Sequence, residues 1–320
     1  METIEFLSNY TMLRPLTTLS LSAKIIDNLH KNGYYYVEDI DNNPEIVEKY
    51  VNSEMLKKSL NPPITLTSLD HWQAELQYQK LKTSSESLND ILDGGFQCGT
   101  ITELCGIQGS GKTQVCFQAS IAAQLPENVG GLEGQSLYID TRNAFSCQRI
   151  NDFIQGFRKL HPKLSLPTDK ILENIFVSSP KSIDDLNNTI TKLKKILKYS
   201  KNISIRAIIV DSLSFLICST DDPSTRFKNY IQILDNLQDI ASKYNLTVIV
   251  VNELVTQCDV NNEIYFVSAG GQNVANRCQK RLMLARISGS KFAARIIKSS
   301  VMPQVTVPFY ITADGISDEI

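Results

Sequence analysis

Several features that would assign this 320-residue sequence to a class at once are missing from it. No apolar run approaches the roughly 18 residues that a membrane-spanning helix needs. Residues 1–14 include Glu2 and Glu5 and lack a basic start followed by an apolar core, so no secretory signal is visible. We therefore expect a soluble protein without a membrane partner, whose translated and mature chains are the same.

Cysteines in metal-binding or disulfide patterns are also missing. The seven cysteines are odd in number and include no CxxC pair. This pattern argues against both a disulfide framework and a zinc site. We expect reduced intracellular thiols, most of them in the core.

An excess of positive charge is missing as well, because the formal net charge is −2. The chain as a whole therefore does not attract nucleic acid. Acidic residues, however, are absent from residues 264–313, and seven basic residues fall there: Arg277, Lys280, Arg281, Arg286, Lys291, Arg295 and Lys298. A local DNA-binding surface and an ordinary basic face on strands and helices both fit this pattern.

Residues 1–60 predict a small helical module. A helix capped near Ser20 or Ser22 ends at Gly33, and a second helical stretch follows over residues 44–60. Hairpins of this kind bind proteins as often as DNA, and the sequence does not choose between the two.

Residues 61–83 predict a linker with an amphipathic helix. Pro62 and Pro63 break any helix because proline lacks the backbone N–H. The helix that follows places Leu69, Trp72 and Leu76 on one apolar stripe. The stripe packs either on the chain's own core or on a neighbouring subunit, and both alternatives stay open.

Residues 84–320 predict an α/β core. Apolar strands without polar alternation are separated by helical stretches, which is typical of a mostly parallel sheet that is covered on both faces. The last segments have the shorter spacing of hairpins, so we expect them to extend the same sheet.

The strongest chemical signal is the segment GIQGSGKT, which matches GxxxxGK[ST] between an apolar strand and a helical stretch. Glycines let successive backbone N–H groups face a phosphate, and the following helix adds its positive end. We expect Lys112 to contact the β and γ phosphates of ATP and Thr113 to ligate Mg²⁺. The predicted ATP-binding residues of this loop are Gly106, Ile107, Gln108, Gly109, Ser110, Gly111, Lys112 and Thr113.

Three further strand ends carry polar residues. Asp211 follows an apolar strand and is the candidate second Mg²⁺ ligand, although a turn or cap role fits it equally well. The other two strands end at Arg142 and at Asn252-Glu253. Ligands of open α/β sheets lie beyond the carboxyl ends of the strands, so these ends either face the nucleotide or begin solvated loops.

Taken in order, these motifs resemble the RecA-like recombinases of eukaryotes and their paralogues. LNDILDGGFQCGTITELCGIQGSGKTQVCFQ, AIIVDSLSF, VIVVNE and KSSVMPQVTVPFYITADGISD follow the family's order and spacing, and the first sixty residues match loosely. SLSAKIIDNLHKNGYYYVEDI and the KSS…VTVPFYI ending look most like the C paralogue, a subunit of heteromeric recombination mediators. The resemblance implies a RecA-type P-loop ATPase core joined to a small helical N-terminal module.

The resemblance also implies roles for further residues. Arg149 falls at the place of the family's adenine-side arginine, and residues 299–303 at that of the segment that caps ATP across a subunit interface. Residues 255–271 fall in the second DNA-facing loop region. The residues that the resemblance places beside single-stranded DNA are Arg226, in the first loop region, with Gly270, Gly271, Arg277, Lys280 and Arg281.

Two departures from the family pattern concern hydrolysis. The family's water-activating glutamate is replaced by Arg142, and its strand-end Asn-Gln pair is Asn252-Glu253 here. The resemblance therefore implies weak DNA-dependent ATP hydrolysis, with Glu253 as the remaining candidate catalytic group. No phenylalanine-anchored self-assembly motif occurs near residues 65–68, so we expect a hetero-oligomer with other recombinase paralogues.

The sequence thus predicts a paralogue subunit in homologous-recombination DNA repair, located in the nucleus and also in the cytoplasm. It would bind single-stranded DNA and partner paralogues and promote assembly of the recombinase filament. An active strand-exchange recombinase that forms its own filament and a purely architectural adaptor stay open as alternatives. An unrelated phosphate-loop kinase is disfavoured because the sequence shows no separate acceptor-binding domain.

Overall fold

The computed structural model describes residues 13, 15–19, 21–41, 66–200, 203–220, 222–258 and 264–319. The chain divides into two compact units, Met1–Gln73 and Ala74–Ile320. The division falls inside the predicted linker, whose limits stay a prediction. The helical stretch predicted over residues 44–60 lies outside the described residues.

The described part of the first unit is a short helical arrangement. A 3₁₀ turn at Leu16–Thr18 precedes α1 (Ala23–Lys31), which follows Ser22 as its N-cap, and α2 (Val37–Asp41) comes next. Gly33 takes a φ of +86° after α1, a conformation that glycine adopts without strain. The predicted first helix is therefore confirmed.

The linker helix α5 spans Ser68–Leu76. The side chains of its predicted apolar stripe are all more than half exposed, at 56% for Leu69, 59% for Trp72 and 69% for Leu76. The helix is confirmed, and the question of what covers its stripe stays open.

A ten-stranded sheet forms the centre of the second unit, with the order β12-β11-β10-β9-β3-β7-β6-β4-β5 and β8 paired to β7. Neighbouring strands from β9 to β5 are parallel, as the apolar strands predicted. These strands are β3 (Ile101–Gly106), β4 (Gln135–Asp140), β5 (Ile175–Ser178), β6 (Ile205–Asp211), β7 (Thr247–Cys258) and β9 (Lys280–Ser288).

The C-terminal strands extend this sheet as antiparallel hairpins, which confirms the prediction from their spacing. They are β10 (Lys291–Lys298), β11 (Thr306–Thr312) and β12 (Gly315–Ser317). β8 (Ile264–Ser268) pairs in an antiparallel hairpin with the second half of β7, residues 254–258. A separate two-stranded ribbon joins β1 (Lys80–Leu81) to β2 (Phe96–Gln97).

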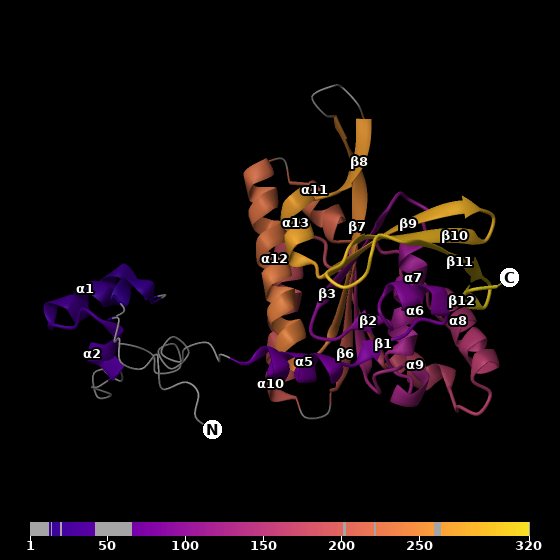
Figure 1. The fold of residues 1–320 in the computed structure, drawn as a ribbon, viewed down its shortest axis with the longest axis horizontal. Coiled ribbons are helices and arrows are strands. Elements are labelled where there is room, and N and C mark those ends of the chain that lie inside the picture. The colour runs from indigo at the N-terminus through magenta and orange to yellow at the C-terminus, as the bar shows by residue number, and fades with distance from the viewer. Residues whose placement is uncertain are drawn as a thin grey trace. The chain divides into compact units, whose positions relative to one another are not determined.

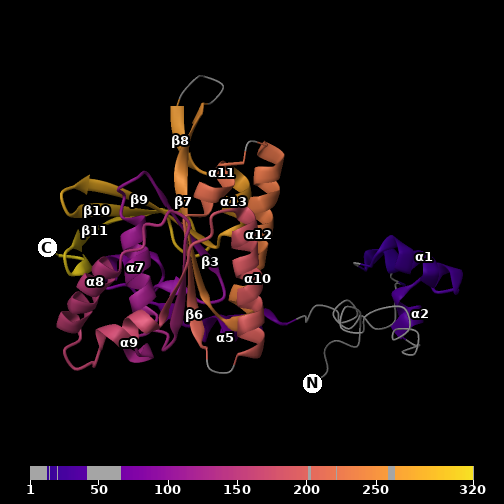
Figure 2. The same ribbon diagram turned by 180° about the vertical axis from the view of Figure 1, so that it is seen from behind.

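Helices cover both faces of the sheet (Figures 1 and 2). One face packs against α6 (Glu86–Ile91), α7 (Lys112–Ala122), α8 (Cys147–Leu160) and α9 (Thr168–Glu173). The other packs against α10 (Ile183–Tyr199), α11 (Leu213–Cys218), α12 (Pro223–Tyr244) and α13 (Gly271–Arg277). Two apolar cores therefore hold the sheet between them, and the predicted mixed α/β architecture is confirmed.

The structure differs from the predicted elements in two places. β5, between α9 and α10, is a strand that the sequence did not indicate, and β7 continues beyond Asn252 to form a hairpin with β8. β5 pairs with β4, which is distant in the chain, whereas the second half of β7 pairs with β8, the next strand. Among the helices that the structure describes, none is long and apolar enough to cross a membrane.

The cysteines are free, and Cys98, Cys105, Cys116 and Cys278 are buried. Burial raises the pKa of Cys105 to about 12. A buried thiol of this kind stays protonated at neutral pH and is inert. These four therefore serve packing, as the sequence predicted for most of the cysteines.

Candidate nucleotide-binding site

The predicted phosphate loop joins the buried strand β3 to the N-terminus of α7. Gly106 ends β3, and a Cβ there would lie 2.4 Å from the Leu284 carbonyl oxygen. Gly111 is the N-cap of α7 with a φ of +91°. These two positions need glycine, and the turn that they allow directs the free N–H groups of α7 toward the loop.

Lys112 begins α7, and its ammonium lies on the loop. Nζ donates to the carbonyl oxygens of Gly106 at 2.7 Å and Ile107 at 2.8 Å. Burial lowers the pKa of Lys112, and the nearby charges of Glu253 and Asp211 oppose that shift. An ammonium group forms stronger hydrogen bonds with an anion than with neutral carbonyl groups, so a phosphate would replace these carbonyl groups as its partner.

Thr113 and Asp211 meet beside this lysine. The Thr113 Oγ1 hydroxyl donates to the Asp211 carboxylate at 2.7 Å, and the Tyr138 hydroxyl donates to the same oxygen at 2.8 Å. Burial raises the pKa of Asp211, while both hydrogen bonds oppose the shift. A buried carboxylate next to a hydroxyl suits a hard divalent cation, which prefers oxygen ligands and supplies the missing positive charge.

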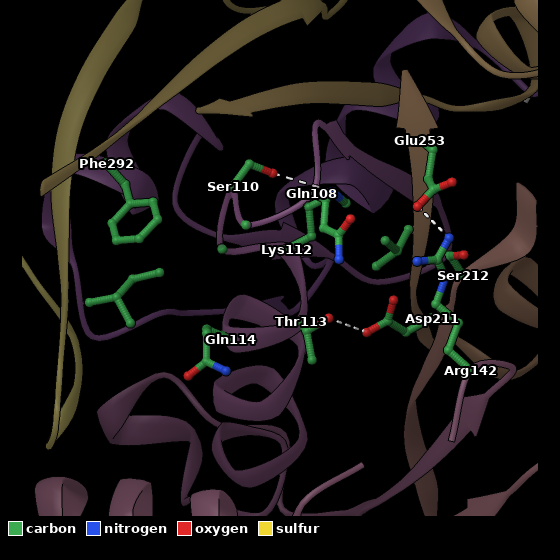
Figure 3. Close-up of a pocket in the computed structure, with 14 residues that line it drawn as sticks. Gln108, Ser110, Lys112, Thr113, Gln114, Arg142, Asp211, Ser212, Glu253 and Phe292 are labelled. Atoms are coloured by element: carbon green, nitrogen blue, oxygen red, sulfur yellow. Dashed lines mark hydrogen bonds and ion pairs between the residues drawn. The ribbon is translucent and has the colours of Figure 1, made fainter. Parts of the chain in front are cut away.

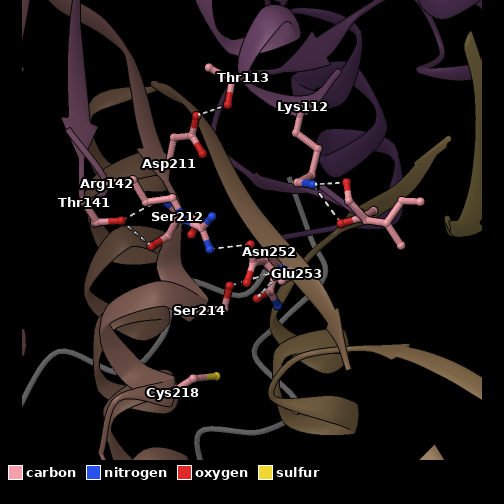
Figure 4. Close-up of polar contacts among 12 residues, drawn as sticks. Lys112, Thr113, Thr141, Arg142, Asp211, Ser212, Ser214, Cys218, Asn252 and Glu253 are labelled. Atoms are coloured by element: carbon pink, nitrogen blue, oxygen red, sulfur yellow. Dashed lines mark hydrogen bonds and ion pairs between the residues drawn. The ribbon is translucent and has the colours of Figure 1, made fainter. Parts of the chain in front are cut away.

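Arg142, which lies just after β4, and Glu253, in the middle of β7, form an ion pair. Because β6 lies between these strands, the pair extends across the end of β6 at Asp211 and Ser212. The Arg142 guanidinium also lies over the Phe215 ring, 4.8 Å from its centroid. Figure 4 shows this pair beside the Thr113–Asp211 hydrogen bond. Arg142 and Glu253 therefore face the phosphate loop, as predicted for these two positions.

The loop and the strand ends enclose a cavity of about 250 Å³. Figure 3 shows Asp211, Arg142 and Glu253 on one side of Lys112 and Phe292 on the other. Phe292 and Ile311 form an apolar wall from β10 and β11. The sequence missed this wall, because no local signal indicates that the C-terminal hairpins fold back over the loop.

The predicted nucleotide-binding residues do not all line the cavity. Residues 108–113 line it. Gly106 and Ile107 do not, and the Ile107 side chain is 55% exposed to solvent. Arg149 does not line the cavity itself, but its Nε donates at 2.7 Å to Gln114, which does, and its guanidinium lies over the Phe153 ring. Its guanidinium donates to the carbonyl oxygens of Thr312 and Ala313, each at 2.6 Å. Arg149 therefore holds the turn between β11 and β12 in this structure.

Three of the predicted DNA-binding residues gather at a second hollow. Arg226 on α12 lines it together with Gly270 and Gly271, which lie at the start of α13. Its volume is about 430 Å³. The β7–β8 hairpin supplies Val255 and Gln257 to the same hollow. The two predicted loop regions therefore meet in space.

Two of the remaining three predicted DNA-binding residues, Lys280 and Arg281, are corrected by the structure. Lys280 is only 3% exposed, and its ammonium donates to the Leu92 carbonyl oxygen. Arg281 is paired with the fully buried Glu103. Neither charge is available to a phosphate, so the basic stretch is not one surface. Arg277 lies nearer the surface and pairs with Asp235 at 2.6 Å.

Glu103 is the centre of a buried polar cluster that the sequence did not reveal. Its carboxylate accepts from Arg281, from Ser268 and from the Asn252 side chain, the last at 2.9 Å. Asn252 also donates to the Ala269 carbonyl oxygen at 2.6 Å. The cluster fixes β7 to the segment before α13 just behind the Arg142–Glu253 pair. An isolated glutamate in an apolar strand gave no signal of these partners.

Comparison with known proteins adds an independent finding. Residues 75–319 match the protein-family model described as Rad51. The DNA repair and recombination protein RadA of Aeropyrum pernix is 30% identical over 256 residues, which cover 79% of this chain and 77% of that protein. RadA of Metallosphaera sedula is 31% identical over 256 residues, covering 79% and 76%. The family match spans every residue of the candidate site.

Proposed function

The chain belongs to the Rad51 family, and from this premise we propose that it is an ATP-binding recombinase paralogue acting in homologous-recombination DNA repair. Its two RadA relatives are named for DNA repair and recombination. In this proposal the protein binds Mg·ATP, single-stranded DNA and partner paralogues, and it promotes assembly of the recombinase filament in the nucleus.

One observation carries the nucleotide part of the proposal, the meeting of Lys112, Thr113 and Asp211 at the N-terminus of α7. A helix N-terminus and a lysine favour phosphate, and a hydroxyl beside a carboxylate favours a divalent cation. Thr113 and Asp211 already share a hydrogen bond of 2.7 Å. A magnesium ion held there would neutralise charge on the β and γ phosphates.

The proposed ATPase activity is weak. Phosphoryl transfer needs a group that orients the attacking water and accepts its proton, and a guanidinium such as that of Arg142 cannot accept one. Glu253 is the candidate carboxylate for this task, and the Arg142 guanidinium lies beside it. ATP therefore acts mainly as a ligand that stabilises one state of the protein.

The proposed DNA face is the hollow lined by Arg226, Gly270 and Gly271, together with Arg277 at the other end of α13. Gly270 and Gly271 take positive φ angles of 81° and 55°. Glycine at such positions lets a phosphodiester chain approach the backbone closely. Lys280 and Arg281 are not part of this proposal, because their charges lie inside the protein.

The proposed hetero-oligomer is supported by the exposed stripe of α5 and by the resemblance of both chain ends to the C paralogue. Isolation of the native complex and identification of its co-purifying subunits test this part directly. Recovery of other recombinase paralogues is expected. Recovery of homopolymers that carry out strand exchange would instead identify an active recombinase.

Filter binding of labelled ATP and of a single-stranded oligonucleotide tests the ligands. We expect Arg226→Gln to weaken DNA binding similarly for all sequences and to reduce its salt dependence, since each phosphate contact contributes about 0.7 to the slope. An exposed lysine elsewhere, Lys170, provides the control Lys170→Gln. If the wild-type protein retained neither ligand, the chain would be an architectural adaptor.

A further inference from the structure

The Arg142–Glu253 pair has an unusual place for an ion pair, because it lies inside the cavity that holds the phosphate loop. Both side chains line that cavity together with Lys112 and Asp211. Each is about one third exposed, at 32% for Arg142 and 38% for Glu253. Pairs with this degree of exposure contribute little to stability. The pair therefore opens easily when a stronger partner for either member arrives.

Charge decides which member exchanges its partner. A triphosphate between Lys112 and Asp211 places its terminal phosphate near the strand ends, where the unmasked Glu253 carboxylate would repel it. A guanidinium binds phosphate through two parallel hydrogen bonds, at least as well as it binds a carboxylate. Arg142 is thus the group that gains by exchange, and the pair with Glu253 is its resting state.

The backbone of Glu253 does not have to move in this exchange. Its N–H donates to Ser214 Oγ at 3.1 Å, and its carbonyl oxygen accepts from the Ala269 N–H at 2.8 Å. The loop that carries Arg142 is fixed as well, because the neighbouring Thr141 hydroxyl donates to the Ser212 carbonyl oxygen at 2.9 Å. Only the two side chains need to rotate.

We propose that Arg142 and Glu253 form a selectivity device for the terminal phosphate. Arg142 exchanges the Glu253 carboxylate for the terminal phosphate of a nucleoside triphosphate, and it stays paired with Glu253 when a diphosphate is bound. The device rests on the proposed function, because it requires a nucleotide on the phosphate loop. Arg142 would then bind the terminal phosphate from the position at which the resemblance places the family's catalytic glutamate.

Equilibrium binding of ADP and of the non-hydrolysable analogue AMP-PNP, each with Mg²⁺, tests the proposal without any activity measurement. We expect Arg142→Gln to weaken AMP-PNP about tenfold, the loss of one charge-assisted contact, and to change ADP less than about twofold. Glu253→Gln is expected to strengthen AMP-PNP severalfold and to leave ADP unchanged, because it removes the competing carboxylate. The double variant falls between the two.

Two controls separate the possible failures. Lys80→Gln removes a cation from a carboxylate pair of similar exposure outside the cavity and is expected to leave both affinities unchanged. Arg142→Lys keeps the charge without the two-pronged geometry and is expected to give an intermediate AMP-PNP affinity, which excludes misfolding as the cause. If Lys112→Ala weakens both nucleotides but the variants of Arg142 change both equally, the selectivity device is refuted and the nucleotide site stands. If Lys112→Ala affects neither nucleotide, the proposed function itself fails.

Discussion

The candidate site combines two kinds of structure. The first is one contiguous segment, residues 101–122, in which β3, the phosphate loop and the start of α7 follow one another. The second is a set of side chains that reach this segment from distant strands, including Arg142, Asp211, Glu253 and Arg281. The contiguous segment carries the complete phosphate-loop motif, whereas the resemblance to the family implies departures in the distant set at Arg142 and Glu253. In the proposed function, nucleotide binding and nucleotide chemistry thus depend on separable parts of the fold.

The largest effect is expected where a distant strand supports the contiguous segment. Arg281→Met leaves the fully buried Glu103 without its counter-charge, which typically costs about 3–5 kcal/mol. Urea unfolding of the core measures the loss. Arg277→Met removes a more exposed pair and is expected to cost less than about 1 kcal/mol. Equal costs for the two variants would show that the Glu103 cluster does not stabilise the fold as described.

A smaller loss is expected when the contiguous segment is changed. Lys112→Ala removes the ammonium that the loop presents, and hydrogen bonds to charged groups are worth about 1.5–3 kcal/mol. ATP affinity should therefore fall on the order of 10- to 100-fold in equilibrium binding with a fluorescent analogue. Lys170→Ala on the exposed side of α9 serves as the control. An unchanged affinity would remove the nucleotide from this loop.

A double variant can restore the glutamate and the glutamine that the resemblance implies at positions 142 and 253. Arg142→Glu combined with Glu253→Gln supplies a general base and removes the competing carboxylate, and such a base contributes about 10²–10⁴-fold in favourable cases. Because the rest of the site is not optimised around it, we expect the rate of ATP hydrolysis to rise by about tenfold. Glu253→Gln alone distinguishes a rearranged site from an impaired one. If Glu253 were already the base, this single change would abolish hydrolysis and Arg142→Glu would alter little.

The smallest effect concerns Asp211 and has a defined pH dependence. Burial raises the pKa of Asp211 above its value in the unfolded chain, so the folded protein binds this proton more tightly. Its contribution favours folding below the unfolded pKa, near 3.9, and is lost as pH rises through the folded pKa. Asp211→Asn should then raise the Tm of the ligand-free protein at pH 7 by about 2 °C.

The same variant separates stability from ligand binding. The gain from Asp211→Asn should shrink toward pH 4, as the wild-type carboxylate takes up its proton, and Mg·ATP should no longer stabilise the variant. Thermal unfolding at both pH values, with and without Mg·ATP, checks this. A loss of stability at pH 7 without ligand would mean that the hydrogen bonds from Thr113 and Tyr138 outweigh the burial of the charge.

Local sequence predicted the contiguous segment well for a physical reason. The turn between β3 and α7 is determined by glycines within a few residues of each other, and Gly111 and Lys112 adopt the positions that the motif implies. The parallel sheet was also predictable, because strands buried on both faces carry no polar alternation. Sequence alone was weaker at β5, a four-residue strand that lies beside β4 at the edge of the sheet that the described residues form.

Prediction from charge failed for a different reason. An acid-free stretch of sequence does not exclude acidic partners that come from elsewhere in the chain, and Glu103 and Asp235 supply them for Arg281 and Arg277. The apolar wall of Phe292 and Ile311 was missed because it forms only when β10 and β11 pair and close over the loop. Contacts between distant strands are set by the register of the sheet, which composition and spacing do not encode.

The most direct test is a single-turnover experiment on the unmodified protein. Excess protein is mixed with limiting labelled ATP, the bound fraction is measured in the same sample, and product is followed with and without single-stranded DNA. We predict that ATP is bound almost completely and stays largely unhydrolysed over an interval in which the Arg142→Glu/Glu253→Gln variant converts most of it. Wild-type protein that converts its bound ATP as fast as that variant would contradict the separation of binding from chemistry.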